Sequence, residues 1–83
     1  MALFMDVHTG MNGITAKQLR MEHDKDVKVQ GKEGVRFLKA WADPKQGKVF
    51  CLAEGPNIEA VKRIHQQAGH PAEEIYELSL TVE

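Results

Sequence analysis

Hydrophobic and polar residues alternate in four short segments of the chain, which is the pattern of half-buried strands. These segments cover residues 2–8, 35–42, 48–54 and 75–82. The second and third are joined by Asp43-Pro44-Lys45-Gln46-Gly47. Because proline fixes φ and glycine permits a positive φ, we expect a hairpin at this turn.

Two further segments have apolar or small residues at helical spacing. The first follows Thr15, a predicted N-cap with Gln18 as its capping-box partner, and it should end at Gly31 and Gly34. The second follows Asn57, another predicted N-cap. The resulting order, βαββαβ, is typical of the α+β ferredoxin-like fold, an antiparallel sheet with both helices on one face. We expect its first and third strands to run parallel, side by side.

The alternation also assigns strand residues to the two faces of the sheet. The floor beneath the helices is expected to hold Leu3, Met5, Val7, Leu38, Ala40, Val49, Cys51 and Ala53. The opposite, open face would hold Phe4, Phe37, Trp41, Phe50 and Leu52. Monomers rarely expose such a patch, so we expect a second copy to cover it in a two-fold homodimer. A strand register displaced by one residue would exchange the faces.

Composition narrows the possible functions. With 83 residues, we interpret 1–83 as a single domain. The net charge is −1 without a Lys/Arg run, so nucleic-acid binding is not expected. No apolar stretch approaches the roughly 18 residues of a membrane span, and the N-terminus lacks the basic region of a secretion signal. The single cysteine cannot form an internal disulfide, and a reduced thiol favours the cytoplasm.

Candidate chemistry is concentrated in histidines and carboxylates. His23 and Asp26 are three residues apart and share a helix face, while His65 lies on the second helix and His70 follows it. We expect these four side chains to converge at one end of the helical layer. Imidazole with carboxylate suits Ni, Zn, Cu or Fe. Alternatively, His23 and His65 are packing residues bonded to backbone, and His70 is solvated.

A second group of potential ligands is expected on the open face. There Asp6, His8 and Glu54 would meet at one end of the first and third strands. This group is either a surface metal site or a set of interfacial hydrogen bonds, with Asp6 paired to Lys39.

The remaining reactive side chains give weaker indications of function. Cys51 is expected to be a small buried hydrophobe, with a ligand role as the alternative. Glu22 points away from the neighbouring imidazole of His23 and is expected to be solvated. Nucleophilic catalysis is not indicated, because no G-x-S-x-G motif is present. A small dimeric enzyme of isomerase or cofactor-poor oxygenase type stays open as the alternative function, with His23, Asp26 and His65 as acid–base groups.

Five segments together resemble a family of small bacterial (actinobacterial) nickel-binding proteins, long catalogued as a domain of unknown function. They are LFMDVHTG, the helix with His23-Asp24-Lys25-Asp26, GVRFLKAW, GKVFCLAEGPN and EAVKRIHQQAGHPAEEIYEL. The resemblance covers nearly the whole chain and implies a ferredoxin-like homodimer that binds Ni²⁺, for nickel sequestration or detoxification rather than catalysis. The metal role carries over onto His8, His23, Asp26, His65 and His70, with Cys51 and Glu54 as second-tier positions. Because binding needs neutral imidazoles, we expect affinity to fall as the pH drops through about 6.5.

Overall fold

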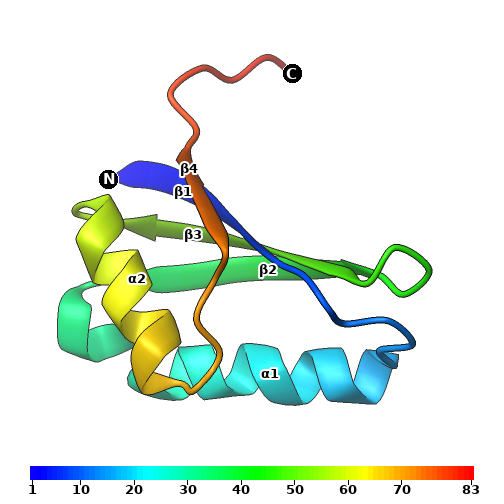
Figure 1. Cartoon of the computed structure of the whole chain (residues 1–83). Coiled ribbons are helices and arrows are strands. Elements are labelled where there is room, and N and C mark those ends of the chain that lie inside the picture. The colour runs from blue at the N-terminus through cyan, green and yellow to red at the C-terminus, as the bar shows by residue number, and fades with distance from the viewer.

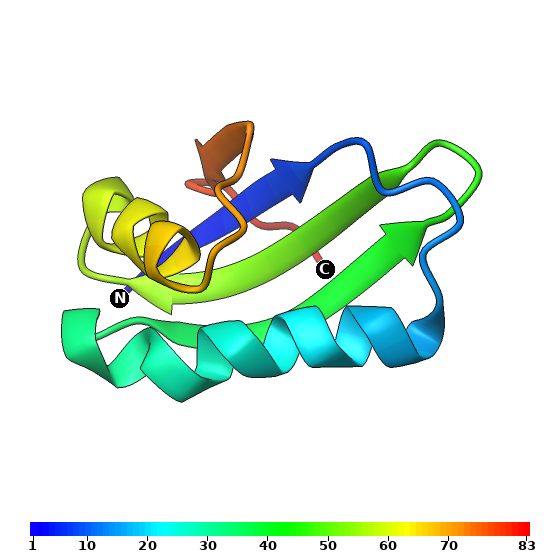
Figure 2. The same ribbon diagram turned by 60° about the horizontal axis from the view of Figure 1, so that its bottom comes forward.

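A four-stranded sheet with two helices forms the fold in the computed structural model, which describes residues 1–83 (Figure 1). The elements are β1 (Ala2–His8), α1 (Ala16–Val29), the 3₁₀ turn η1 (Gln30–Glu33), β2 (Arg36–Asp43), β3 (Lys48–Gly55), α2 (Ile58–Gln67) and β4 (Glu74–Glu77). Both helices cover the same face of the sheet (Figure 2). The expected βαββαβ order and ferredoxin-like fold are therefore confirmed. Neither helix is long and apolar enough to cross a membrane.

Side-chain caps fix where the helices begin. Thr15 Oγ1 accepts a hydrogen bond from the backbone N–H of Gln18, and Gln18 Oε1 accepts one from the backbone N–H of Thr15. Asn57 Oδ1 accepts a hydrogen bond from the backbone N–H of Ala60 at the start of α2. The end of α1 passes into η1, which closes at Gly34 with a φ of 69°. Both predicted helix starts are confirmed.

The strand order is β2-β3-β1-β4, and every neighbouring pair is antiparallel. The expected parallel arrangement of the first and third strands is wrong, because β1 and β3 run in opposite directions with Leu3 opposite Glu54 and His8 opposite Val49. A crossover through α1 returns the chain parallel to β1, and the hairpin after β2 then reverses it. Glu54 consequently lies at the far end of β1 from His8.

The expected faces are also wrong for β1. Phe4, Asp6 and His8 are buried on the helix side, at 1%, 0% and 7% exposure. Leu3, Met5 and Val7 take the open face. The polarity of Asp6 and His8 suggested exposure, but imidazole and carboxylate partners satisfy them in the interior. The alternative, in which a register displaced by one residue exchanges the two faces, therefore describes β1.

A β-bulge in β2 changes which residues face the helices. Phe37 and Lys39 pair with consecutive residues of β3, so Leu38 is the extra residue. Phe37 is therefore buried in the core rather than on the open face, and Leu38 is 39% exposed rather than beneath the helices. Trp41, paired with Phe50, faces the open side as expected and is 42% exposed.

The hydrophobic core fills the space between the sheet and the helices. On β3, the expected positions of Val49, Cys51 and Ala53 beneath the helices are confirmed. Completely burying a side chain the size of valine, leucine or phenylalanine stabilises the fold by roughly 1.5–3 kcal/mol. The core consists of Phe4, Ile14, Val35, Phe37, Val49, Cys51, Ala53, Ala60, Val61 and Ile64.

The last strand is shorter than the alternation of residues 75–82 predicts. β4 covers only Glu74–Glu77, and its final contact with β1 is the hydrogen bond from the Leu78 N–H to the Leu3 carbonyl. Residues 78–83 form an arm that rises away from α1 (Figure 1), with Leu80 91% and Val82 94% exposed.

Candidate metal-binding site

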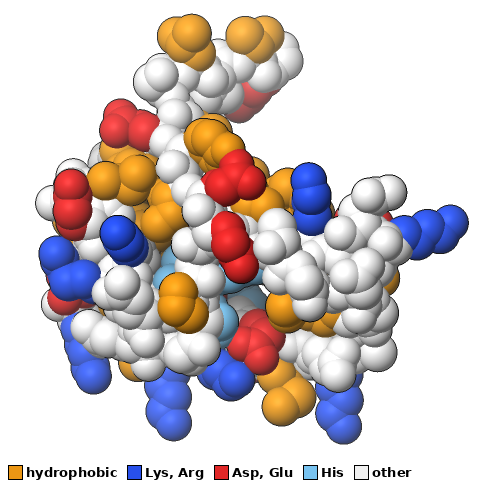
Figure 3. Space-filling view, viewed as in Figure 1, with side chains coloured by type: hydrophobic (Ala, Val, Ile, Leu, Met, Phe, Trp, Pro, Cys, Tyr) orange, Lys and Arg blue, Asp and Glu red, His pale blue; other side chains and the backbone are white.

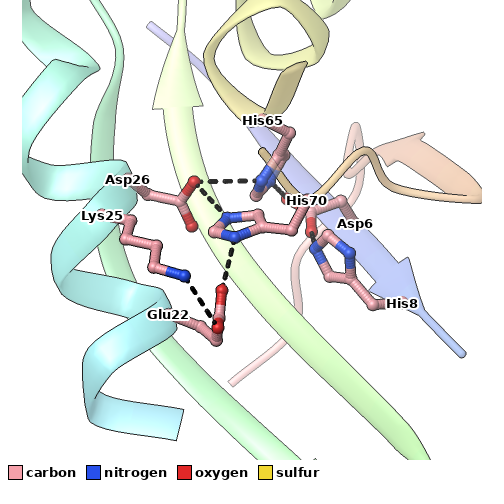
Figure 4. A network of polar contacts seen from close by, with 7 residues as sticks. All are labelled: Asp6, His8, Glu22, Lys25, Asp26, His65 and His70. Atoms are coloured by element: carbon pink, nitrogen blue, oxygen red, sulfur yellow. Dashed lines mark hydrogen bonds and ion pairs between the residues drawn. The ribbon is translucent and has the colours of Figure 1, made fainter. Parts of the chain in front are cut away.

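Four buried side chains from β1, α1 and α2 meet between the sheet and the helices (Figure 4). His65 Nε2 donates a hydrogen bond to Asp6 Oδ2 at 2.5 Å, and His65 Nδ1 lies 3.1 Å from Asp26 Oδ1. His8 Nε2 lies 3.0 Å from Asp6 Oδ1. His65 is thereby placed between two carboxylates that come from different elements of the fold.

His70 extends this network to the surface. Its Nε2 lies 2.7 Å from Asp26 Oδ1 and its Nδ1 lies 2.7 Å from Glu22 Oε2. Lys25 Nζ in turn donates a hydrogen bond to Glu22 Oε1 at 3.1 Å. The backbone N–H of His70 bonds to the His65 carbonyl, which ties the loop after α2 to the helix end. Imidazoles and carboxylates therefore alternate from the buried floor to solvent.

The electrostatics of the buried part favour a charged His65. Burial alone would lower its pKa, but hydrogen bonding and charge from Asp26 and Asp6 raise it to about 9. Burial would raise the pKa of Asp6 and Asp26, but the neighbouring imidazoles outweigh this and hold both pKa values below their ordinary range. In the metal-free protein, an imidazolium is thus held between two carboxylates at neutral pH.

The same opposing effects of burial and charged neighbours set the pKa values of His70 and Glu22. Burial lowers the pKa of His70, but its contacts with Asp26 and Glu22 outweigh burial and raise the pKa. Burial likewise raises the pKa of Glu22, and contacts with Lys25 and His70 bring it below the ordinary value. Glu22, expected to be solvated, is 31% exposed, and its carboxylate also contacts Nδ1 of His70.

Three buried polar atoms have no hydrogen-bond partner: Asp6 Oδ1, His23 Nδ1 and His65 Nδ1. Two of these atoms nevertheless have an ionisable neighbour, because Asp6 Oδ1 lies 3.0 Å from His8 Nε2 and His65 Nδ1 lies 3.1 Å from Asp26 Oδ1. An unsatisfied buried polar group costs roughly 1–3 kcal/mol, so each such group in a native structure calls for an explanation. Carboxylate oxygen and imidazole nitrogen are both ligands for divalent metal ions.

A cavity of about 40 Å³ opens between α1 and the sheet, and of these three residues only His23 lines it. Figure 3 shows histidine side chains at the bottom of the hollow. This volume has room for roughly three water-sized objects, enough for an ion with a water or two. Its polar lining consists of His8, Glu22, His23, Asp26, Cys51 and His70.

Two sets of potential ligands each contribute residues to the cavity lining, and the atoms within each set lie within 4.8 Å of one another. One set is Asp6, His8, Cys51 and His65, and the other is Asp26, His65 and His70. Two ligand atoms about 2.1 Å from an ion and at right angles to each other lie about 3 Å apart. The nitrogen–oxygen separations of 2.7 and 3.1 Å around Asp26 Oδ1 fit this spacing.

Cys51 is the only sulfur ligand in either set. Burial and the nearby charges of Asp6 and Asp26 raise the pKa of its thiol well above the ordinary value. A thiol must lose its proton to bind metal strongly. The donor set that is ready to bind is therefore nitrogen and oxygen rather than sulfur.

The structure brings together four of the five residues to which the sequence assigned a metal role: His8, Asp26, His65 and His70. The fifth, His23, lines the same cavity but belongs to neither close ligand set. The interpretation of His23 and His65 as packing residues bonded to backbone does not describe His65, whose ring nitrogens face carboxylates.

The expectation of a second, separate group on the open face is wrong. Asp6 and His8 belong to the same buried network as His65, whereas Glu54 lies near Arg36, 3.9 Å away. Asp6 is paired with imidazoles and not with Lys39. Residues two apart on a strand share a face, so the spacing of Asp6 and His8 could have placed both in one cluster once the face was known.

Nearly the whole chain is similar to a protein of known structure. None of the curated proteins matches the chain. The crystal structure of SCO4226 from Streptomyces coelicolor A3(2) is similar, with a TM-score of 0.96 and 53% sequence identity over 98% of this chain and 100% of that chain. The family model for nickel responsive protein SCO4226-like matches residues 4–78. The chain therefore belongs to the SCO4226-like family of nickel responsive proteins.

Proposed function

We propose that this protein binds Ni²⁺ in the buried cluster and sequesters it as part of metal homeostasis or detoxification, without catalysing a reaction. The observation that carries the proposal is the set of three buried ligand atoms without hydrogen-bond partners: Asp6 Oδ1, His23 Nδ1 and His65 Nδ1. His23 lines the cavity of ionic size, and so do His8 and Asp26, the side chains next to Asp6 Oδ1 and His65 Nδ1. The nickel responsiveness of the family supports nickel as the ion.

The proposed ligands combine the sequence assignment with the geometry. His8, Asp26, His65 and His70 supply imidazole nitrogen and carboxylate oxygen within the two close sets, and His23 stands at the cavity wall. Asp6 joins them as a carboxylate ligand. Such a nitrogen and oxygen set suits several first-row divalent ions, and Ni²⁺ ranks above Mn²⁺, Fe²⁺ and Co²⁺ in general affinity.

The cavity supports metal binding over the acid–base enzyme. An organic substrate needs a pocket of roughly 300–1,000 Å³, far larger than the 40 Å³ beside the buried histidines. A wider groove of about 280 Å³ adjoins it between α1 and β2, but of His23, Asp26 and His65 it reaches only His23. An acid–base mechanism needs the reacting groups at the substrate, and Asp26 and His65 are too deeply buried to reach that groove.

We further propose a homodimer through the open face, in the cytoplasm. Trp41 and Tyr76 are 42% and 51% exposed on that face, next to the partly buried Leu3, Met5 and Leu52. The arm adds Leu80 and Val82, which are almost completely exposed. A second copy facing the sheet would remove these apolar side chains from water. The buried, reduced Cys51 fits a reducing compartment.

Nickel titration of the purified protein tests the metal proposal. Calorimetry on the wild type, His8→Ala and His70→Ala should show at least a tenfold loss of affinity in both variants. Asp24→Asn is the matched control, because Asp24 is an exposed carboxylate on α1 whose ion pair is with Arg20. Its affinity should equal that of the wild type. Wild-type affinity in both histidine variants would place nickel elsewhere and overturn the proposal.

A further inference from the structure

Asn12 stands directly before a glycine, Gly13, in the exposed loop between β1 and α1. An asparagine side chain loses its amide when the backbone nitrogen of the next residue attacks Cγ, and glycine has no side chain to obstruct that attack. The only other asparagine, Asn57, precedes Ile58, whose branched Cβ crowds the same approach. Asn12 is therefore the position in this chain that is most open to deamidation.

Hydrogen bonds to the turn of the β2–β3 hairpin hold both reacting groups away from each other. Asn12 Nδ2 donates to the Lys45 carbonyl at 3.1 Å, and the backbone N–H of Gly13 donates to the Pro44 carbonyl at 3.0 Å. For the attack, the Gly13 nitrogen has to give up this hydrogen bond, lose its proton and turn toward Asn12 Cγ. The folded state therefore opposes the reaction at both atoms.

The contact between the loop and the hairpin turn is close because Gly47 has no side chain. The backbone N–H of Met11 donates to the Gly47 carbonyl at 2.9 Å, and the two segments lie side by side (Figure 2). A Cβ added at Gly47 would lie 2.4 Å from Asn12 Oδ1 and 2.7 Å from Asn12 Cγ. The Asn12 side chain thus lies directly on the backbone of Gly47, which is buried beneath it.

We propose that Asn12 is a self-modification site, at which spontaneous deamidation is restrained by the hairpin turn and proceeds when the loop opens locally. In the reaction, a bond forms between the Gly13 nitrogen and Asn12 Cγ, and the bond from Cγ to Nδ2 breaks. Ammonia leaves with the proton of the Gly13 N–H. Water then opens the resulting succinimide at either carbonyl, which gives aspartate or isoaspartate, and nothing is oxidised or reduced.

The product cannot restore the contact with the hairpin turn. A carboxylate at position 12 has no N–H to donate, and it would face the Lys45 carbonyl as a second acceptor. It would also add a negative charge to the groove of about 330 Å³ that Asn12 lines together with Glu22. The modification therefore releases the loop irreversibly, and it does not depend on the proposed metal-binding function.

Peptide mass spectrometry of protein incubated at mildly alkaline pH tests the proposal. Deamidation at Asn12 should be at least tenfold slower in the folded wild type than in the same chain unfolded in urea, and Asn57 should stay unmodified in both. Folded Gly47→Ala should react severalfold faster than the folded wild type, because the added Cβ displaces the Asn12 side chain. Gly31→Ala is the matched control, since no atom lies within 4 Å of its added Cβ, and it should keep the wild-type rate.

Each alternative result overturns a part of the proposal. Equal rates in folded and unfolded wild type would show that the hairpin turn does not restrain Asn12. A folded Gly47→Ala protein with the wild-type rate would show that the contact over Gly47 is not the restraint. An unfolded chain that loses ammonia at Asn57 before Asn12 would place the site elsewhere. Because the main comparison uses the wild type alone, it does not depend on whether a variant folds.

Discussion

His65 Nε2 lies 2.5 Å from Asp6 Oδ2, and both side chains are completely excluded from solvent. This contact joins α2 to β1 across 59 positions of the chain. Asp26 holds the other nitrogen of the same ring from α1. The cluster therefore connects three elements of the fold, and it occupies interior positions that an apolar core would otherwise fill. A protein whose interior is arranged in this way should show it in stability, in pH dependence and in metal binding.

Replacing Asp6 by Asn should destabilise the metal-free protein. The amide keeps the size of the side chain but removes the charge that faces His65, leaving the buried imidazolium with fewer compensating partners. Breaking a buried ion pair in this way costs about 3–5 kcal/mol. Urea unfolding at neutral pH measures the loss. Asp24→Asn, an exposed substitution with the same chemistry, should change the free energy of unfolding by less than about 0.5 kcal/mol. Equal effects of the two substitutions would contradict the buried pair.

Stability of the metal-free protein should fall as the pH rises through about 9. The pKa of His65 is raised from 6.5 to about 9, so the folded state holds this proton more tightly than the unfolded chain does. The stabilisation is complete below about pH 6.5 and is lost as the pH passes the folded pKa. A shift of this size corresponds to roughly 3 kcal/mol. Urea midpoints measured between about pH 6 and pH 10 would show the decline.

At acid pH the dependence is the opposite, and the stability of the metal-free protein should fall as the pH falls. Asp6 and Asp26 have pKa values below the ordinary value of 3.8, so their contribution to stability is present above that value and is lost as the pH falls through the folded pKa. In His65→Gln the alkaline decline should be clearly smaller than in the wild type, because only His70, whose pKa is also raised, still contributes to it. An unchanged alkaline decline in that variant would assign it to another group.

Local chemistry explains why the elements could be predicted. The hydrogen bonds of Thr15, Gln18 and Asn57 lie within a few residues of each cap, so the sequence shows both partners at once. The antiparallel pairing of β1 and β3 also follows from the order of elements alone. The expected parallel pairing was therefore a mistake in deriving the topology, and the sequence contained the information needed to avoid it.

The faces depend on information that alternation does not contain. Asp6 and His8 look exposed on a polarity scale, and only their imidazole and carboxylate partners, distant in sequence, make burial favourable. The bulge at Leu38 inserts one residue without disturbing the apparent alternation, so Phe37 and Trp41 end on opposite faces. Four of the five residues to which the sequence assigned a metal role still lie together. They are carried by β1 and by the two helices, and the order of these elements could be predicted from the sequence.

Trp41→Lys should convert the proposed homodimer to a monomer. Trp41 is 42% exposed on the open face, beside Phe50, and a lysine there would bring a charge into the contact between two copies. Light scattering coupled to size exclusion measures the molar mass. Met21→Lys is the matched control, because Met21 is 53% exposed on α1 rather than on the sheet, and this variant should remain dimeric. A monomeric wild-type protein would contradict the assembly.

Gly47→Ala should destabilise the hairpin between β2 and β3. Gly47 has a φ of 70°, and an added Cβ would lie 2.4 Å from Asn12 Oδ1 and 3.0 Å from the Asn12 backbone nitrogen. We expect a loss of about 1–3 kcal/mol from strain at this position, measured by thermal or urea unfolding. Gly31→Ala is the control, because no atom lies within 4 Å of its added Cβ and its φ is not positive. A comparable loss at Gly31 would show that glycine content, and not this close approach, limits stability.

Nickel affinity should keep rising well above pH 6.5. Nickel has to displace the proton held by His65, whose pKa of about 9 places this competition higher than for a free imidazole. The raised pKa of His70 acts in the same direction. Below those pKa values, each proton displaced lowers the apparent affinity roughly tenfold for every unit of pH. Calorimetry from about pH 6 to pH 9 measures the slope, and titrations in two buffers of different ionisation enthalpy count the protons released. An affinity that is constant above about pH 7 would mean that nickel does not bind His65, since the carboxylates on both sides of this ring keep its proton in place until the metal arrives.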